Sequence, residues 1–177
     1  MHDVIKERGG NTTHAGCTTC IIQCSNIVPD AHGRRLVARL EYETLVMCGS
    51  NLGIGDLWDL ESAIDHLAAL GWIDEERVGC MGWSQGGYIS AYAGLHSGRF
   101  KAVSVGAGIS DWYTYHISND IPDFTVDYLS GSPFRDRDLY DKTAPISQLA
   151  QARTPMLIQH GTEDRRVPLS NAMELYR

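Results

Sequence analysis

The sequence predicts an α/β fold with a mostly parallel sheet and flanking helices. Short apolar segments at 77–81, 102–109 and 156–160 have the length and composition of buried strands. Helix-like segments separate them, and strands that alternate with helices are typical of a parallel sheet. This order becomes clear only after residue 50. We therefore expect a poorly defined N-terminal segment over residues 1–50 and a partial α/β domain over residues 51–177.

Composition and charge narrow the class of protein. The 177 residues, 43% apolar and 21% charged, indicate one globular domain. A formal charge of −7 and the lack of a basic block argue against a nucleic-acid partner. No uncharged apolar run reaches the roughly 18 residues that a spanning helix needs. The N-terminus also lacks the apolar core of a secretory signal. We expect no membrane partner and a cytoplasmic location.

The cysteines raise the possibility of a metal site near the N-terminus. His14, Cys17, Cys20 and Cys24 lie close together and could supply four soft ligands to zinc. Structural zinc sites usually take two pairs of ligands from separate turns, which this compact spacing does not offer. Reduced thiols are therefore the expected interpretation, and we predict neither a metal nor another cofactor.

The first regular element of the domain is a helix that we expect Asp56 to cap. Leu57, Leu60 and Ile64 follow at spacings of three and four residues, which places them on one face of a helix. Gly71 offers a stop, because glycine readily takes the left-handed conformation that ends many helices.

A Gly-x-Ser-x-Gly-Gly run occupies residues 82–87, between a predicted strand and a predicted helix. This arrangement presents a serine oxygen on a sharp, strained turn, as a nucleophile requires. Glycine at position 82 avoids crowding in the turn, and glycine at position 86 lets the helix approach the sheet. Ser84 is thus the candidate nucleophile and the N–H of Gln85 a candidate oxyanion donor. An inert serine in a glycine-rich turn is the alternative.

Beyond the strand at 102–109, the pattern is weaker. The stretch from Asp111 to about Asp141 is aromatic and acidic without clear periodicity, so we expect irregular structure there. Residues 145–152 suggest a short helix, and a further helix begins at Ser170.

Four segments together resemble the catalytic domain of the prolyl oligopeptidase family of serine peptidases. They are Gly55-Asp56-Leu57-Trp58-Asp59, Asp74-Glu75-Glu76-Arg77-Val78, the run from Gly82 to Tyr88, and the run from Thr154 to Pro168. The resemblance extends from about Asn51 to the end of the chain. It implies an α/β-hydrolase fold, incomplete at both ends, and a serine-type peptidase that hydrolyses short peptides through an acyl-enzyme on Ser84 without a cofactor.

The same resemblance gives Asp164 the role of the carboxylate that orients the catalytic histidine. Glu163 and Asp111 are rival acids, the second because other α/β hydrolases place their acid after the preceding strand. Trp112 and Tyr115 match the segment that lines the pocket for the residue before the scissile bond. Core packing is the alternative for both aromatic residues.

The chain departs from the family pattern at the histidine. In α/β hydrolases the order along the chain is serine, acid, histidine, yet no histidine follows Asp164. His160 is interpreted as structural, and nothing in its spacing requires His116 to reach the site. We therefore expect the catalytic histidine beyond Arg177 and a nearly inactive chain. A carboxylesterase on the same fold and a non-catalytic fragment or binding module are the alternatives.

Overall fold

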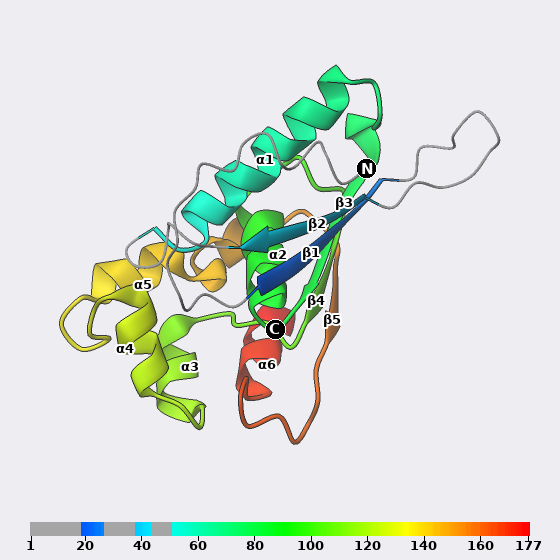
Figure 1. Ribbon diagram of the computed structural model, residues 1–177. Coiled ribbons are helices and arrows are strands. Elements are labelled where there is room, and N and C mark those ends of the chain that lie inside the picture. The colour runs from blue at the N-terminus through cyan, green and yellow to red at the C-terminus, as the bar shows by residue number, and fades with distance from the viewer. Residues whose placement is uncertain (1–18, 27–37, 44–50) are drawn as a thin grey trace.

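A computed structural model describes residues 19–26, 38–43 and 51–177, with side chains described for the last range only. Within these ranges, five strands form one sheet in the order β2-β1-β3-β4-β5, and helices lie against it (Figure 1). The strands are β1 (Thr19–Asn26), β2 (Ala38–Glu43), β3 (Val78–Trp83), β4 (Ala102–Gly106) and β5 (Met156–Gln159).

The sheet has a parallel part and an antiparallel part. β3, β4 and β5 run parallel to one another, which confirms the three strands predicted after residue 50. β1 pairs antiparallel with both β2 and β3. The sequence analysis did not predict β1 and β2, although residues 38–43 alternate apolar and charged side chains, a pattern typical of a half-buried strand.

Helix α1 (Ile54–Ala69) begins three residues before the start predicted from Asp56 as its cap. Gly53 occupies the N-cap with φ 76°, and Asp56 lies inside the first turn, where its Oδ2 accepts a hydrogen bond of 2.9 Å from the Gly53 N–H. From the third position of the helix, Asp56 therefore accepts a hydrogen bond from the N–H of the N-cap residue, as the acid of a capping box does. Gly71, with φ 69°, follows the end of the helix as expected. The buried apolar side chains of α1 are Leu57, Leu60 and Ile64.

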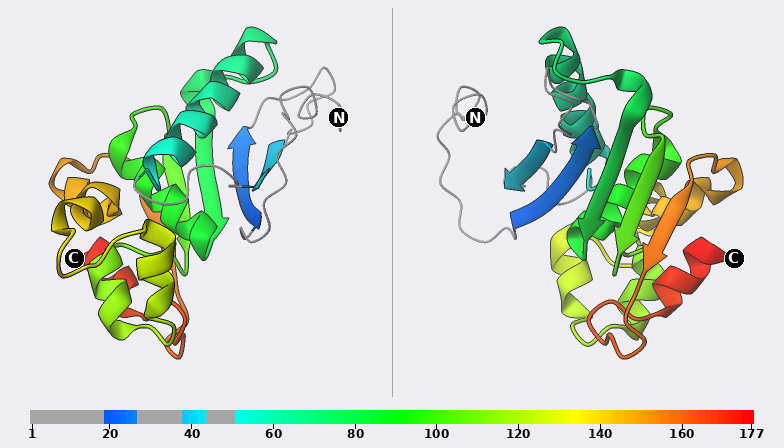
Figure 2. Two further views of the ribbon diagram at one scale, coloured as in Figure 1. Left: turned by 60° about the vertical axis from the view of Figure 1, so that its left-hand side comes forward. Right: turned by 90° about the vertical axis from the view of Figure 1, so that its right-hand side faces the viewer.

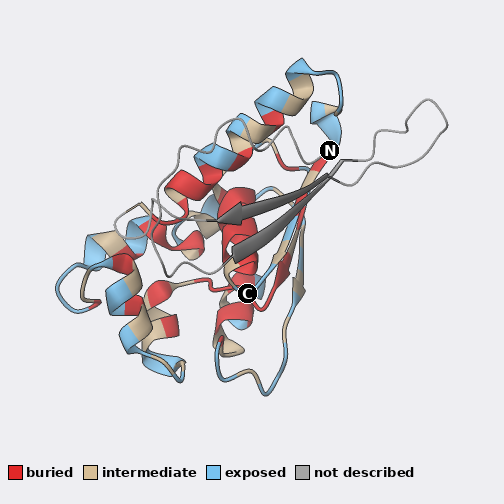
Figure 3. Cartoon of the chain, in the orientation of Figure 1, coloured by how far each residue is buried: buried red, intermediate tan, exposed pale blue. Residues whose placement is uncertain are grey.

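Helix α2 (Gln85–His96) lies at the centre of the core. Every residue from Gly86 to Leu95 is buried, as the red colour of this helix in Figure 3 shows. Its small residues let it approach the sheet closely: a Cβ added at Gly94 would lie 2.9 Å from the Val103 side chain. The helix packs on β3 and β4, so it fixes the strand–turn–helix unit around Ser84.

The segment between β4 and β5 corrects the sequence analysis. Instead of irregular structure, it contains α3 (Trp112–Ser118), α4 (Asp123–Leu129) and α5 (Arg137–Thr143). Each helix has only seven residues, which is too short for a helical repeat to stand out in the sequence. The remaining elements are the 3₁₀ helices η2 (Glu75–Arg77) and η3 (Pro145–Gln151) and the helix α6 (Ser170–Tyr176).

The two faces of the parallel strands differ in burial. One face carries Val78, Val103 and Val105, which are all buried under the helices. On the other face Trp83 is 61% exposed and Leu157 is 58% exposed. The described helices gather behind the sheet in the right-hand view of Figure 2 and leave this second face open.

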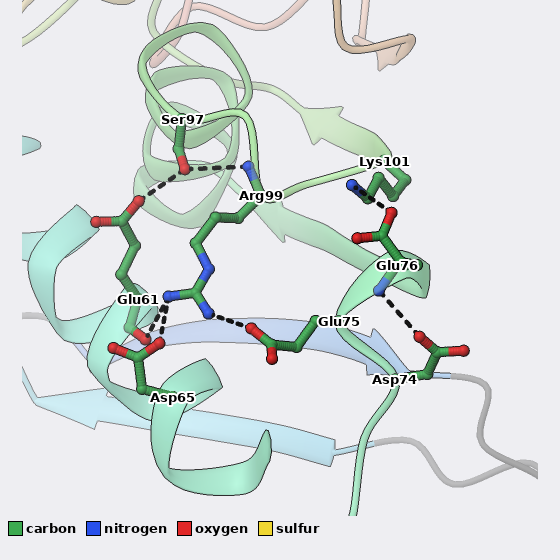
Figure 4. Close-up of polar contacts among 8 residues, drawn as sticks. All are labelled: Glu61, Asp65, Asp74, Glu75, Glu76, Ser97, Arg99 and Lys101. Atoms are coloured by element: carbon green, nitrogen blue, oxygen red, sulfur yellow. Dashed lines mark hydrogen bonds and ion pairs between the residues drawn. The ribbon is translucent and has the colours of Figure 1, made fainter. Parts of the chain in front are cut away.

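An ion-pair cluster fixes the end of the sheet opposite the Ser84 turn. The Arg99 guanidinium contacts the carboxylates of Asp65 at 2.5 Å and Glu75 at 2.7 Å, so it joins α1 to η2 (Figure 4). The hydroxyl of Ser97 donates a 2.7 Å hydrogen bond to Glu61 on α1. Among the described helices, none has the length and the apolar character needed to cross a membrane.

Candidate active site

Ser84 occupies the turn between β3 and α2 in a conformation that is unfavourable for a residue with a side chain. Its φ is 57° and its ψ is −116°, a strain that costs on the order of 1–3 kcal/mol. Its N–H donates to the carbonyl oxygen of Gly106 at 2.8 Å, and its own carbonyl accepts from the Tyr88 N–H at 3.0 Å. Neighbouring elements therefore hold the backbone of Ser84 on both sides.

The hydroxyl of Ser84 is not used for helix capping. A serine at an N-cap usually accepts a hydrogen bond from an N–H of the first helical turn. Ser84 makes no such bond, and the residue is exposed. The turn thus presents an accessible oxygen, as a nucleophile requires.

Two pairs of backbone contacts explain the glycines of the turn. A Cβ at Gly82 would lie 2.3 Å from the carbonyl oxygen of Gly86, so the start of α2 packs directly on β3. A Cβ at Gly87 would lie 2.2 Å from the carbonyl oxygen of Gly106 and 2.9 Å from the Cα of Gly108. The sequence analysis assigned the approach of the helix to Gly86 and missed the contribution of Gly87, whose contact lies on another strand.

Gln85 is the first residue of α2, and its N–H has no partner within the helix because the first N–H groups of any helix lack one. It lies directly beside Ser84, at a helix terminus that favours negative charge. The backbone N–H of Gln85 can therefore donate to an oxyanion that forms next to the Ser84 hydroxyl. The Gln85 side-chain Nε2 is buried and has no hydrogen-bond partner in the described part of the chain.

Asp164 lies in the loop after β5. Its Oδ1 accepts hydrogen bonds of 2.9 Å from the N–H groups of Arg166 and Val167. No group within residues 51–177 donates a hydrogen bond to its Oδ2. The carboxylate is thus held by one oxygen, and the other stays available to a further partner.

Ser84 and Asp164 both follow the carboxyl ends of parallel strands, so they lie at the same end of the sheet. Trp83 is opposite Gly106, and Gly106 is opposite Gln159. Two strand spacings therefore separate the ends of β3 and β5, or about 10 Å. The right-hand view of Figure 2 shows these carboxyl ends together.

The rival acids have other surroundings. Asp111 caps α3, because its Oδ1 accepts a 2.6 Å hydrogen bond from the Tyr113 N–H. Glu163 is exposed, and no hydrogen bond fixes its carboxylate within the described residues. Of the three carboxylates that follow a strand, Asp164 has the most suitable position.

Trp112 and Tyr115 are buried, with 0% and 2% of their surface exposed. The Trp112 ring meets Tyr88 edge to face at 4.9 Å and Tyr115 at 5.8 Å between centroids. Burial raises the pKa of Tyr115 to about 12; the charge of Arg166 opposes this effect, whereas Asp120 and Asp164 add to it. Tyr115 is thus close to the loop of Asp164, but the burial of both rings favours the core-packing alternative.

No histidine among residues 51–177 bonds to Ser84 or Asp164. His160 Nε2 lies 2.6 Å from the carbonyl oxygen of Val167, and His116 Nδ1 lies 3.1 Å from the carbonyl oxygen of Pro122. His96 stacks on Tyr92.

Residues 51–177 contain no group of three or more histidine, cysteine or acidic residues arranged for a metal. The four zinc candidates (His14, Cys17, Cys20 and Cys24) lie outside the residues whose side chains the structure describes.

A strained serine after one parallel strand and an acid after a later one are features of the α/β-hydrolase fold, and the chain has this fold. The model of the prolyl oligopeptidase family matches residues 46–177, which is more than half of the chain. The chain therefore belongs to the prolyl oligopeptidase family. A second model, for domains 2 and 3 of aldehyde ferredoxin oxidoreductase, matches residues 3–79, which is less than half.

Relatives and solved structures agree with this family. The acylamino-acid-releasing enzyme of Homo sapiens is 31% identical over 76% of this chain and 20% of its own length. An uncharacterized peptidase of Bacillus subtilis, YuxL, is 34% identical over 59% of this chain and 16% of its own length. The structure of the Pyrococcus horikoshii acylaminoacyl peptidase matches with a TM-score of 0.68 at 30% identity and covers 72% of this chain and 21% of that one. The chain thus spans about a fifth of the length of these proteins.

Proposed function

We propose that the protein is a serine peptidase of the prolyl oligopeptidase type, with Ser84 as its nucleophile. The observation that carries this proposal is the backbone of Ser84, strained at φ 57° and ψ −116° with a hydroxyl that caps no helix. Such strain persists only where surrounding structure maintains it, and it concentrates at functional sites. Membership of the family and the position of Asp164 support the same role.

In this mechanism the Ser84 Oγ attacks the carbonyl carbon of a peptide bond while a histidine accepts its proton. The Gln85 N–H donates to the oxyanion that develops, a contribution of about 10²–10³ in rate for one donor. The same histidine returns the proton to the leaving amine, and water then releases the acyl group from Ser84. Asp164 orients the histidine through its free oxygen. The described residues do not supply this histidine, and its loss reduces the rate about 10⁶-fold in such triads.

The substrate is proposed to be a short peptide. Relatives named acylaminoacyl peptidases make N-acylated amino-acid anilides the first substrates to test, and one such structure carries a peptide chloromethyl ketone, Z-Gly-Gly-Phe-chloromethyl ketone. Matched short esters separate peptidase from carboxylesterase activity. Trp112 and Tyr115 are proposed to support the substrate pocket from behind rather than to form its surface. The cytoplasmic location remains a prediction.

Chemical rescue tests the nucleophile. A fluorophosphonate probe is incubated with the chain at increasing concentrations of imidazole, which substitutes for the missing proton acceptor, and the modified residue is identified by peptide mass spectrometry. We expect an adduct on Ser84 that forms faster as imidazole increases. The Ser84→Ala variant and a denatured sample serve as controls. An adduct elsewhere, or none at any imidazole concentration, would refute the proposal.

A further inference from the structure

The loop of Asp164 is closed by a contact between its two ends. We define the acid loop as residues 160–167, which connect the end of β5 to the turn before α6. His160, at the start of this loop, places its Nε2 2.6 Å from the carbonyl oxygen of Val167 at the other end. A carbonyl oxygen can only accept a hydrogen bond, so Nε2 carries a proton and donates it.

The acceptor and the imidazole are both held in place. Val167 is buried, with 3% of its surface exposed, so its carbonyl belongs to a fixed part of the core. The Nδ1 atom of His160 is buried and has no partner within the described residues. A buried polar atom without a partner is unfavourable, so Nδ1 gains nothing from this position. Among the described residues, the hydrogen bond from Nε2 to Val167 is the polar contact that holds the imidazole.

Asp164 lies inside the closed loop, and its carboxylate depends on the same segment. The two N–H groups that hold Oδ1 belong to Arg166 and Val167. The N–H and the carbonyl of Val167 thus have separate partners: the N–H bonds to Asp164 and the carbonyl to His160. The N–H and the carbonyl of Val167 lie in two successive peptide planes, so hydrogen bonds that hold both groups restrict the φ and ψ rotations between them.

From this arrangement we infer that His160 is a positioning residue for Asp164. It holds Val167 so that Oδ1 stays bound to the backbone of the loop and Oδ2 is left to accept a hydrogen bond from a histidine. The inference rests on the proposed role of Asp164. It assigns His160 no contact with substrate, because its donor nitrogen is already occupied by Val167.

Two variants separate positioning from simple packing. In His160→Gln the side-chain amide can donate to the Val167 carbonyl, whereas His160→Leu has similar volume and no donor. The readout is amide hydrogen exchange, followed residue by residue by NMR. We expect His160→Leu to speed exchange at the N–H groups of Arg166 and Val167 about tenfold, and His160→Gln to stay near the wild-type rates.

Val103 and Val105 of β4 serve as internal references, because a general loss of stability would speed their exchange as well. Unchanged rates at Arg166 and Val167 in His160→Leu, equal acceleration at β4, or a glutamine variant as fast as the leucine variant would each overturn the inference. In the wild-type chain, ¹⁵N signals of the imidazole must also show the proton on Nε2.

The probe reaction on Ser84 is run on the same samples. If Ser84 is not labelled but exchange responds as expected, the proposed function fails and the role of His160 in the loop remains. If Ser84 is labelled and exchange does not respond, only the inference about His160 fails.

Discussion

The N–H of Ser84 donates a 2.8 Å hydrogen bond to the carbonyl oxygen of Gly106, the last residue of β4. This bond connects the turn after β3 to the neighbouring parallel strand. Because the φ and ψ angles of Ser84 are unfavourable, a rigid partner is needed to hold them. The geometry of the proposed nucleophile therefore depends on a strand that contributes no catalytic side chain.

Replacing Ser84 with glycine should stabilise the fold while it removes the hydroxyl. Glycine tolerates φ 57° without strain, so the free energy of unfolding should rise by about 1 kcal/mol after allowance for the greater freedom of glycine in the unfolded chain. Ser84→Ala retains the Cβ and the strain, and should change stability by less than about 0.5 kcal/mol. Urea denaturation measures both. Equal midpoints for the two variants would contradict the strain.

Replacing Gly87 with alanine should destabilise the protein strongly. The new Cβ would lie 2.2 Å from the carbonyl oxygen of Gly106, and neither backbone can move without displacing α2 or β4. We expect a loss of at least about 2 kcal/mol in urea denaturation. Gly98→Ala is the matched control, because a Cβ at Gly98 has no atom within 4 Å. Similar losses in the two variants would show that the close contact is not the cause.

Replacing Arg99 with methionine should remove the ion pairs that join α1 to η2. The guanidinium is the shared partner of Asp65 and Glu75, and its removal should lower stability by about 1–2 kcal/mol at low salt. Lys101→Met is the control, because Lys101 forms one exposed pair with Glu76 at 3.2 Å and should lose less than about 0.5 kcal/mol. The difference between the variants should shrink as salt increases. A loss independent of salt would indicate packing instead.

The free energy of unfolding should fall as the pH is lowered, because His96 becomes protonated. Burial lowers the pKa of its imidazole in the folded protein below 6.5, despite the opposing hydrogen bond to the Tyr92 carbonyl. The unfolded chain then binds the proton more readily, so this contribution is complete above pH 6.5 and is lost as the pH falls through the lower, folded pKa. Denaturation of the wild-type chain and of His96→Gln across this range gives the comparison. Parallel pH profiles would exclude the effect.

The sequence was sufficient to predict the strand–turn–helix unit around Ser84 and the three parallel strands. These features rest on local signals: glycines at fixed spacing and apolar runs of strand length. The seven-residue helices α3, α4 and α5 were missed because two turns of helix leave no clear repeat. The start of α1 was placed late, because the sequence does not distinguish an aspartate at the N-cap from one inside the first turn.

The candidate site was predictable to a lesser extent. The Ser84 turn is recognisable from a motif of five consecutive residues. The contacts that hold the acid loop, in contrast, come from distant parts of the chain. Arg166 pairs with Asp120 at 2.8 Å, although 46 positions separate them, and no local pattern reveals such a contact. The burial of Trp112 likewise follows from tertiary packing, since an aromatic residue after a strand can line a pocket or fill a core.

The glycines at positions 82, 87 and 108 meet where α2 touches β3 and the end of β4, and each has a backbone atom within 2.7 Å of the point where a Cβ would lie. None of the three can carry a side chain unless the facing backbone moves, so these positions cannot change independently. For directed evolution, mutations at this junction would be eliminated before any new activity could be selected.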